Sequence, residues 1–147
     1  TPRRHQTVKD IVEENVPFDK DDVLKLVPER HKEKLDAHKT VYATGYRRTR
    51  HGEQQLELRC DGIAGCLRTP EGGSSKQYLV VKQGRSTHAR LLTVREVARL
   101  MGAPDTFKLP GSYNDGYKAM GDAVAMPVAQ FIGERFLTKI AEAVYND

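Results

Sequence analysis

The chain has 147 residues, of which 38% are hydrophobic and 30% are charged, with a formal net charge of +4. This balance excludes a disordered tail and a collagen-like fibre. No apolar run approaches the roughly 18 to 20 residues that cross a bilayer, so no membrane partner is expected. The sequence starts at Thr1 without an initiator Met or a basic-then-apolar leader. We therefore expect a cytoplasmic protein, present here as a fragment or as a small subunit.

Residues 1–39 are expected to form a helical lead-in or connector. Thr7 and Asp10 have the spacing of a helix cap and lie just before apolar residues that share one face. Residues 29–38 are mostly charged, with Leu35 as their only large apolar residue. That composition predicts an exposed helix or connector.

Residues 40–89 are expected to form a small, irregular β-rich region. Apolar and polar side chains alternate over 41–46 and again over 56–60, and a His-Gly turn signal at 51–52 lies between them. A third, short strand is predicted over 78–81, after a loop that carries Gly and Ser. Together with the helices on either side, these strands predict an α+β fold.

Residues 90–147 are expected to be helical again. Thr93 and Glu96 form a capping box, which predicts a helix that starts there and stops near Gly102. A second short helix is predicted over 115–120. Its end is placed at Gly121.

A third helix is predicted to begin near Pro127. Its apolar residues recur at spacings of three and four, which predicts one long apolar stripe, and we expect this stripe to be buried. The stripe consists of Val128, Phe131, Ile132, Phe136, Ile140, Ala143 and Val144.

The positive charge is localised in the middle of the chain. Residues 40–89 contain eight Lys and Arg against four Asp and Glu, whereas both flanking segments are neutral. Arg47, Arg48 and Arg50 form a cluster within this region. A local basic surface is typical of nucleic-acid contact, and the planar fork of arginine suits phosphates and guanine edges. A solvated basic face without a partner is the alternative.

The two cysteines, Cys60 and Cys66, do not predict a metal site. A closed zinc site needs four ligands at short spacings, and no His pair follows these cysteines. Two cysteines are also too few for a disulfide framework. We expect two half-buried thiols in a reducing compartment.

Two stretches of the last third carry a specific resemblance. Residues 90–107, RLLTVREVARLMGAPDTF, strongly resemble the ninth motif of the cytosine-C5 DNA methyltransferases. Residues 117–129, YKAMGDAVAMPVA, resemble the tenth and last motif of the same family. Upstream, residues 64–70, AGCLRTP, and 72–75, GGSS, look like the DNA-facing core of its target-recognition region. The chain departs from the tenth motif at Asp122, where the family usually has Asn.

The resemblance implies duplex DNA as the partner and S-adenosyl-L-methionine as the cofactor. In the family, the tenth motif lines the cofactor pocket, which corresponds here to Asp122, Ala123 and Val124. The flanking helices would complete the large domain of the methyltransferase. The charge cluster and the resemblance together give the expected DNA-binding residues: Arg47, Arg48, Arg50, Arg68, Thr69, Gly72, Gly73, Ser74, Ser75 and Lys76.

The chemical groups of such an enzyme are missing from the chain. The family needs a glycine-rich cofactor turn, a Pro-Cys nucleophile and a Glu-Asn-Val carboxylate. Cys60 follows Arg59 and Cys66 follows Gly65, so neither cysteine has the required context. We read the Glu-Asn-Val sequence at 14–16 as coincidence, because in the family's order it lies on the wrong side of the recognition region. No catalytic residue is therefore assigned.

The resulting interpretation is the C-terminal, target-recognition part of a bacterial-type DNA (cytosine-5-)-methyltransferase, as found in restriction-modification systems. The chain alone is expected to be inactive. Its N-terminal catalytic part, in the same enzyme or in a separate subunit, would bind most of the cofactor. Two alternatives stay open: a DNA-binding module without a catalytic partner, and a basic RNA-binding domain. The sequence does not indicate which DNA site is recognised.

Three tyrosines and one pair on the predicted Thr93 helix are further candidates for functional groups. Tyr42, Tyr46 and Tyr78 are expected to pack between strands rather than to stack on bases. Arg95 and Glu96 are expected to be structural. Glu96 would serve in the helix cap, and Arg95 would form ion pairs between the helix and the recognition region.

Overall fold

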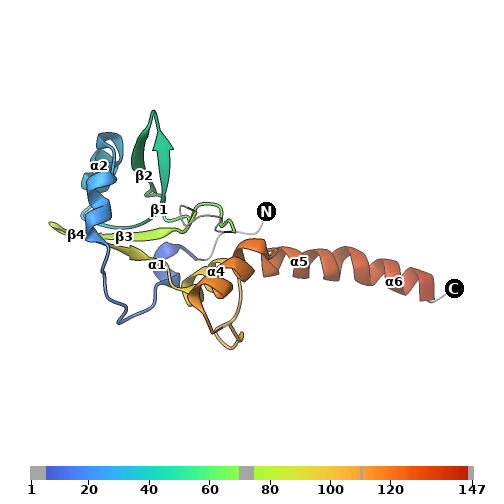
Figure 1. Ribbon diagram of the computed structural model, residues 1–147. Coiled ribbons are helices and arrows are strands. Elements are labelled where there is room, and N and C mark those ends of the chain that lie inside the picture. Colours follow the sequence, from blue (N-terminus) through green and yellow to red (C-terminus); the bar gives the residue numbers. More distant parts are fainter. Residues whose placement is uncertain (1–5, 70–74, 110, 146–147) are drawn as a thin grey trace.

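An antiparallel sheet forms the centre of the fold (Figure 1). The computed structural model describes residues 6–69, 75–109 and 111–145, and within these the sheet has four strands. In spatial order, the strands are β2 (Glu53–Arg59), β1 (Thr40–Arg50), β3 (Tyr78–Gln83) and β4 (Ser86–Leu91). Helices accompany the sheet, so the predicted α+β class is confirmed.

Strand β1 is shared between two neighbours. Residues 40–45 pair with β3 and residues 44–50 pair with β2, so the two halves of β1 belong to different parts of the sheet. Gly45 lies at the overlap. A Cβ atom there would come within 2.5 Å of the carbonyl oxygen of Glu57 on β2, so this close approach requires glycine. The outer part of the β1–β2 hairpin therefore rises from the sheet as a two-stranded arm.

Strand β3 is buried on both sides because helices cover both faces of the sheet. Leu79 and Val81 belong to one apolar cluster, whereas Tyr78 and Val80 belong to the other. This division follows from the alternation of side chains along a strand. The helices that contribute to the first cluster are α1 (Val8–Ile11), α3 (Val94–Leu100) and α4 (Tyr113–Asp122). Those that contribute to the second are η1, a 3₁₀ helix (Asp21–Leu26), and α2 (Glu29–Asp36).

Both predicted helix caps are confirmed. At α1, the Asp10 carboxylate accepts a hydrogen bond of 2.7 Å from the backbone N–H of Thr7. At α3, the Thr93 hydroxyl accepts from the N–H of Glu96 at 3.1 Å, and Glu96 accepts from the N–H of Thr93 at 2.9 Å. Gly102, with a φ of +79°, follows the end of α3 as predicted.

Glu96 also takes part in the only fully buried ion pair among the described residues. Its side chain is 0% exposed, and both terminal nitrogens of Arg90 donate to it at 2.7 and 2.6 Å. The backbone N–H of Glu13 donates to the same carboxylate at 2.8 Å. This pair joins β4, α3 and the lead-in segment. The expectation for Arg95 is wrong, because its guanidinium donates to the carbonyl oxygens of Pro104 and Phe107 and forms no described ion pair.

Two elements differ from the predictions. Strand β4 was not predicted, and the expected division at 89/90 falls inside it. Helix α4 is longer than predicted, and Gly121 lies within it rather than ending it. A Cβ atom on Gly121 would lie 2.6 Å from the backbone nitrogen of Thr69. This glycine therefore permits a close approach between α4 and the segment that contains Thr69.

The C-terminal helix projects away from the rest of the molecule (Figure 1). It comprises α5 (Met126–Ile132), a π-helical turn η2 (Gly133–Leu137) and α6 (Thr138–Tyr145). The predicted burial of its apolar stripe is wrong, because the helix diverges after Pro127 packs on Gly102 and no described element lies along it. No helix in the described part of the chain has the length and apolar character to span a membrane. The exposed stripe includes Val128, Phe131, Ile132, Phe136, Leu137, Ile140 and Val144, each 44% to 66% exposed.

Candidate nucleic-acid interface

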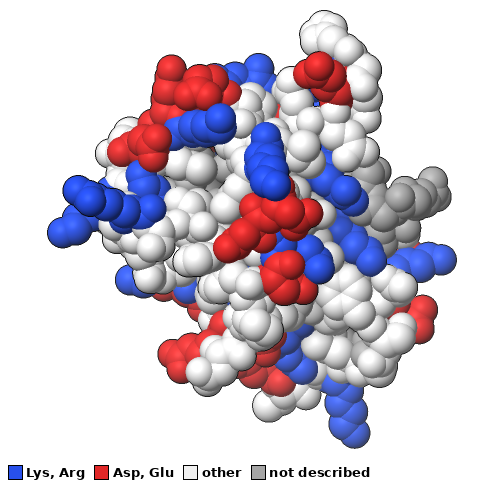
Figure 2. Space-filling view, turned by 60° about the vertical axis from the view of Figure 1, so that its left-hand side comes forward, with Lys and Arg blue, Asp and Glu red and all other residues white. Residues whose placement is uncertain are grey.

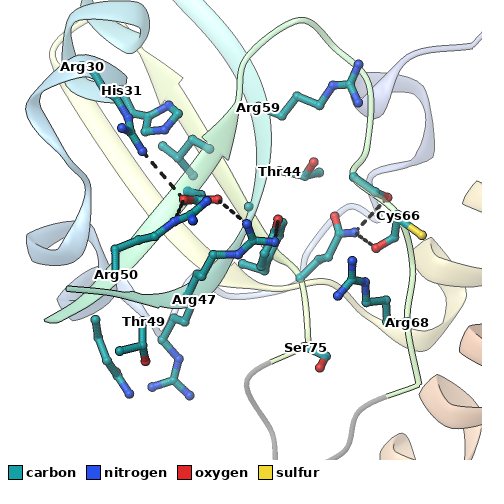
Figure 3. A pocket seen from close by; sticks show the side chains of 18 residues that line it. Arg30, His31, Thr44, Arg47, Thr49, Arg50, Arg59, Cys66, Arg68 and Ser75 are labelled. Atoms are coloured by element: carbon teal, nitrogen blue, oxygen red, sulfur yellow. Dashed lines mark hydrogen bonds and ion pairs between the residues drawn. The ribbon is translucent and has the colours of Figure 1, made fainter. Parts of the chain in front are cut away.

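A groove of about 790 Å³ lies between the β1–β2 hairpin and residues 65–68 (Figure 3). Among the described residues that line it, six are arginines, none is a lysine, and Glu57 is the only carboxylate. The arrangement therefore favours an anionic ligand. The lining arginines are Arg30, Arg47, Arg48, Arg50, Arg59 and Arg68.

Three of these arginines converge on Glu57. The Nε of Arg50 donates to the Glu57 carboxylate at 3.0 Å, and nitrogens of Arg30 and Arg48 lie 3.7 Å from it. Partial burial by itself would raise the pKa of this carboxyl. The hydrogen bond from Arg50 and the charges of all three guanidinium groups outweigh burial and lower the pKa. Glu57 is therefore ionised at neutral pH and holds three cations together.

The cluster at 47–50 is divided between two faces of the hairpin. Arg48 and Arg50 lie on the same face as Glu57, because residues two apart along a strand point the same way and Tyr46 pairs with Glu57. Arg48 donates to the Tyr46 hydroxyl at 2.7 Å, and its guanidinium lies 5.1 Å from the ring centroid. Arg47 points to the opposite face, with its guanidinium 6.0 Å from the Tyr78 ring centroid.

The remaining two arginines are placed differently. Arg59 is held by Asp61 through a two-pronged contact of 2.9 to 3.1 Å, so much of its charge is neutralised. Arg68 is exposed, and no hydrogen bond or ion pair of its side chain is found within the described ranges. Figure 3 shows Arg68 on the chain segment that faces Arg47 and Arg50 across the groove. The two walls of the groove therefore both present guanidinium groups.

Gln77 joins these two walls. Its side chain is 1% exposed, and the amide nitrogen donates to the carbonyl oxygens of Gly65 and Cys66 at 2.9 and 3.1 Å. Its backbone N–H donates to the Tyr117 hydroxyl at 2.7 Å. Gln77 therefore fixes the backbone that carries Arg68 relative to the sheet. Sequence reasoning missed it, because a single Gln before a strand gives no signal of this role.

The structure brings only some of the predicted DNA-binding residues together. Arg47, Arg48, Arg50, Arg68 and Ser75 line the groove. Sequence reasoning missed two further arginines there. Arg30 lies in a mixed charge run that resembles any solvated helix, and Arg59 ends a strand in the expected alternation.

The other predicted residues lie elsewhere or are not described. Lys76 points to α4, where its ammonium group donates to Asn114 at 2.7 Å and lies 4.8 Å from the Tyr113 ring centroid. The Thr69 hydroxyl donates to the Asp122 carboxylate. The predicted positions Gly72, Gly73 and Ser74 fall outside the described residues.

The predicted cofactor turn lies beside residues 68–69. Asp122 is tied to Thr69, and the backbone of Arg68 and Thr69 packs directly on Gly121. The next residue, Ala123, has an extended backbone and is exposed, and Val124 is 66% exposed. An exposed apolar turn of this kind fits one wall of a cofactor pocket whose other walls come from elsewhere.

The described charged groups outside the groove and the two cysteines show no arrangement typical of a further site. On the face shown in Figure 2, Lys and Arg side chains alternate with Asp and Glu rather than forming one continuous basic field. Cys60 is half-buried, and burial raises the pKa of its thiol. Cys66 is exposed. Within the described ranges, no three His, Cys, Asp or Glu side chains are grouped so that they could hold a metal ion.

The known proteins that this chain is similar to are named as methyltransferases. A family model described as C-5 cytosine-specific DNA methylase matches residues 2–138. The chain is 50% identical over 44 residues to DNA (cytosine-5)-methyltransferase CMT2 of Oryza sativa subsp. japonica, which covers 30% of this chain and 3% of that protein. It is 46% identical over 55 residues to DNA (cytosine-5)-methyltransferase 1 of Gallus gallus, with coverage of 35% and 4%. Type II methyltransferase M.HpaII of Haemophilus parainfluenzae is 43% identical over 51 residues, with coverage of 35% and 14%. The chain thus spans a small part of each relative's length.

Proposed function

Since the chain belongs to the family of C-5 cytosine-specific DNA methylases, we propose that it is the C-terminal target-recognition part of a DNA (cytosine-5-)-methyltransferase. In this role it binds duplex DNA sequence-specifically and completes an enzyme that depends on S-adenosylmethionine. The nucleophile and its supporting carboxylate are assigned to the N-terminal catalytic part. The chain alone is inactive, because neither Cys60 nor Cys66 follows a proline as the family's nucleophile does.

The arginine-lined groove is the observation that carries this proposal. Arginine side chains from both walls face a space that has one lining carboxylate, so a polyanion is the ligand that best matches it. Arg48 donates to the Tyr46 hydroxyl and Arg50 donates to Glu57, and arginines oriented in this way suit contacts with the phosphate backbone of DNA. Arg68 carries no such contact within the described ranges, and we assign it to a guanine edge in the major groove.

The methyl donor is assigned to the boundary between this chain and the catalytic part. S-adenosylmethionine, when bound, supplies the methyl group that is transferred to cytosine. Ala123 and Val124 would line one side of its pocket. Asp122 would hold the turn in place through its contact with the Thr69 hydroxyl.

The catalytic part is also the partner proposed for the projecting helix. Exposed apolar stripes of this length are rare on soluble surfaces and mark contact sites. The stripe runs along α5, η2 and α6, away from the groove, so it can be covered while DNA is bound. Whether the catalytic part is joined covalently or is a separate subunit does not change this contact.

The test measures the salt dependence of duplex binding by fluorescence anisotropy, using the chain as it is. Replacing Arg47, Arg48 and Arg50 by alanine is expected to weaken binding to every duplex. The slope of log K against log salt should flatten by about 0.9 for each phosphate that the variant no longer neutralises. The same preparation should incorporate no label from radioactive S-adenosylmethionine into DNA.

A second triple variant serves as the control. Lys9, Lys25 and Lys118 are exposed and do not line the groove, so their replacement by alanine removes the same charge elsewhere. Equal slopes for the two triple variants would contradict the assignment of the DNA-binding face. Equal affinity for duplex DNA and RNA of the same sequence would instead favour an RNA-binding domain. Label incorporated above a control without protein would contradict the assigned inactivity.

A further inference from the structure

The lead-in helix α2 contributes a cation to the groove. Arg30, on the first turn of α2, directs its guanidinium to Glu57 on β2 (Figure 3). Its side chain remains 63% exposed. This residue lies outside the segment 40–89, to which the sequence assigned the basic surface. The α2 helix is therefore a third element at the groove, beside the hairpin and the segment that carries Arg68.

The position of Arg30 is fixed by the packing of α2. Leu35 of α2 is buried in the same apolar cluster as Leu56 and Leu58 of β2. At the same, C-terminal end of α2, the Lys82 ammonium group donates to the carbonyl oxygen of Leu35 at 3.2 Å and to Asp36 at 2.6 Å. These contacts hold α2 against the sheet, so Arg30 does not need to be brought to the groove when a ligand binds.

Charge and hydrogen bonding around Glu57 are both unbalanced. Arg30, Arg48 and Arg50 together carry three positive charges, and the one carboxylate leaves a local excess of two. Each guanidinium also has five N–H donors, far more than one carboxylate can accept from all of them. Two of the three contacts to Glu57 are long, at 3.7 Å. The cluster can therefore accept a further anion without losing its present one.

We propose that Arg30, Arg48 and Arg50 form a clamp for one backbone phosphate of the duplex, and that Glu57 keeps the clamp assembled while weakening its hold on DNA of any sequence. The inference rests on the proposed function, since the phosphate comes from DNA. A carboxylate beside the phosphate opposes binding by like-charge repulsion, so affinity is left to depend on contacts that read bases. Glu57 is thus a specificity-determining residue, although it touches no base.

The experiment compares two pairs of single variants on duplexes of random sequence. Arg30→Ala should flatten the salt slope by up to about 0.9, the value for one whole phosphate contact, because two of the three cations of the clamp remain. Lys32→Ala, two residues along the same helix, should leave the slope unchanged, because Lys32 pairs with the exposed Glu29 outside the groove. Glu57→Gln should tighten binding by about threefold or more, because one charge is removed close to the phosphate. Glu29→Gln changes the net charge equally and should have little effect.

Each outcome bears on the inference. A flatter slope for Arg30→Ala alone, with tighter binding for Glu57→Gln alone, supports it. Equal slopes for Arg30→Ala and Lys32→Ala overturn the role of Arg30. Weaker or unchanged binding by Glu57→Gln, in a variant that keeps the circular dichroism spectrum of the unaltered chain, overturns the role of Glu57. If these single variants fail as described while the triple variant of Arg47, Arg48 and Arg50 still alters the slope, only the inference fails. If the unaltered chain binds no duplex, the proposed DNA-binding function fails with it.

Discussion

The buried pair of Arg90 and Glu96 offers a quantitative test of what holds the fold together. Glu96→Gln replaces one carboxylate oxygen by an NH2 group and leaves the size of the side chain almost unchanged. Glutamine can still accept from the Thr93 N–H, so the cap of α3 is retained. The variant therefore spares the helix start, and any decrease in stability reports on the ion pair together with the hydrogen bond from the Glu13 N–H.

The magnitude follows from burial. Arg90 is 2% exposed and Glu96 is 0% exposed, so water cannot replace the missing carboxylate. Both contacts from Arg90 are shorter than 2.8 Å, and the glutamine amide would direct a donor at one of them. Removing one charge of a buried pair costs about 3 to 5 kcal/mol, against a total stability of about 5 to 15 kcal/mol for a domain. The substitution should therefore remove much of the stability of the chain.

Urea unfolding followed by circular dichroism measures this decrease. The midpoint should fall with little change in the m-value, because the surface exposed on unfolding is the same. Asp105→Asn is the control, because Asp105 pairs with Arg99 on the surface, where its side chain is 65% exposed. That variant should be far less affected, since solvent screens exposed pairs. A decrease below about 1 kcal/mol for Glu96→Gln would refute the reasoning.

Two further predictions concern α4 and the packing of η1 on β4. Gly121→Ala should lower the thermal unfolding midpoint. Alanine stabilises a helix by about 1 kcal/mol relative to glycine. Its Cβ atom would, however, lie 2.6 Å from the backbone nitrogen of Thr69, and overpacking costs about 1 to 3 kcal/mol. Gly133→Ala, with no atom within 4 Å of its Cβ, should keep or raise helix content, and equal effects of both variants would contradict the close approach. Hydrogen bonds to Asp21, first from the Ala89 N–H and then from His88, hold the pKa of Asp21 below its ordinary 3.8. The contribution of Asp21 to stability is therefore present above pH 3.8 and is lost as the pH falls through the folded-state pKa. The stabilities of the unaltered chain and of Asp21→Asn should then converge between about pH 5 and pH 2. A constant gap between their urea midpoints would count against this linkage.

The helix starts and two of the strands could be predicted because they depend on residues that are close in sequence. The capping residues at Thr7 and Thr93 work through neighbours three positions away, so their effect can be read without knowing the fold. The strands at 41–46 and 56–60 were predicted from alternation in the same way. Strand β4 was missed because Ser86–Leu91 has only Ala89 and Leu91 as apolar residues, and its position depends on pairing with β3.

Features that depend on distant residues could not be predicted. The apolar stripe of the last helix predicts a buried side, but the pattern does not show that the described chain leaves this stripe exposed. Arg30 has the same sequence surroundings as any solvated lysine or arginine of 29–38, and only the packing of α2 places it by Glu57. The alternation along β1 does indicate that Arg47 separates from Arg48 and Arg50, although their closeness in sequence suggests a single cluster.

If the catalytic part covers the apolar stripe as proposed, the folding of the projecting C-terminal helix is coupled to assembly. A helix without tertiary contacts gains little stability in water, because nucleation is unfavourable and most helix stability in proteins comes from the packing of an apolar face. A partner surface that covers the stripe from Val128 to Val144 would supply the missing free energy by burying apolar area. Helix formation and binding then become a single thermodynamic event. The apparent affinity of the two parts for each other therefore includes the cost of ordering this segment, so a substitution that only raises helix propensity on its solvent side would tighten assembly without touching the partner.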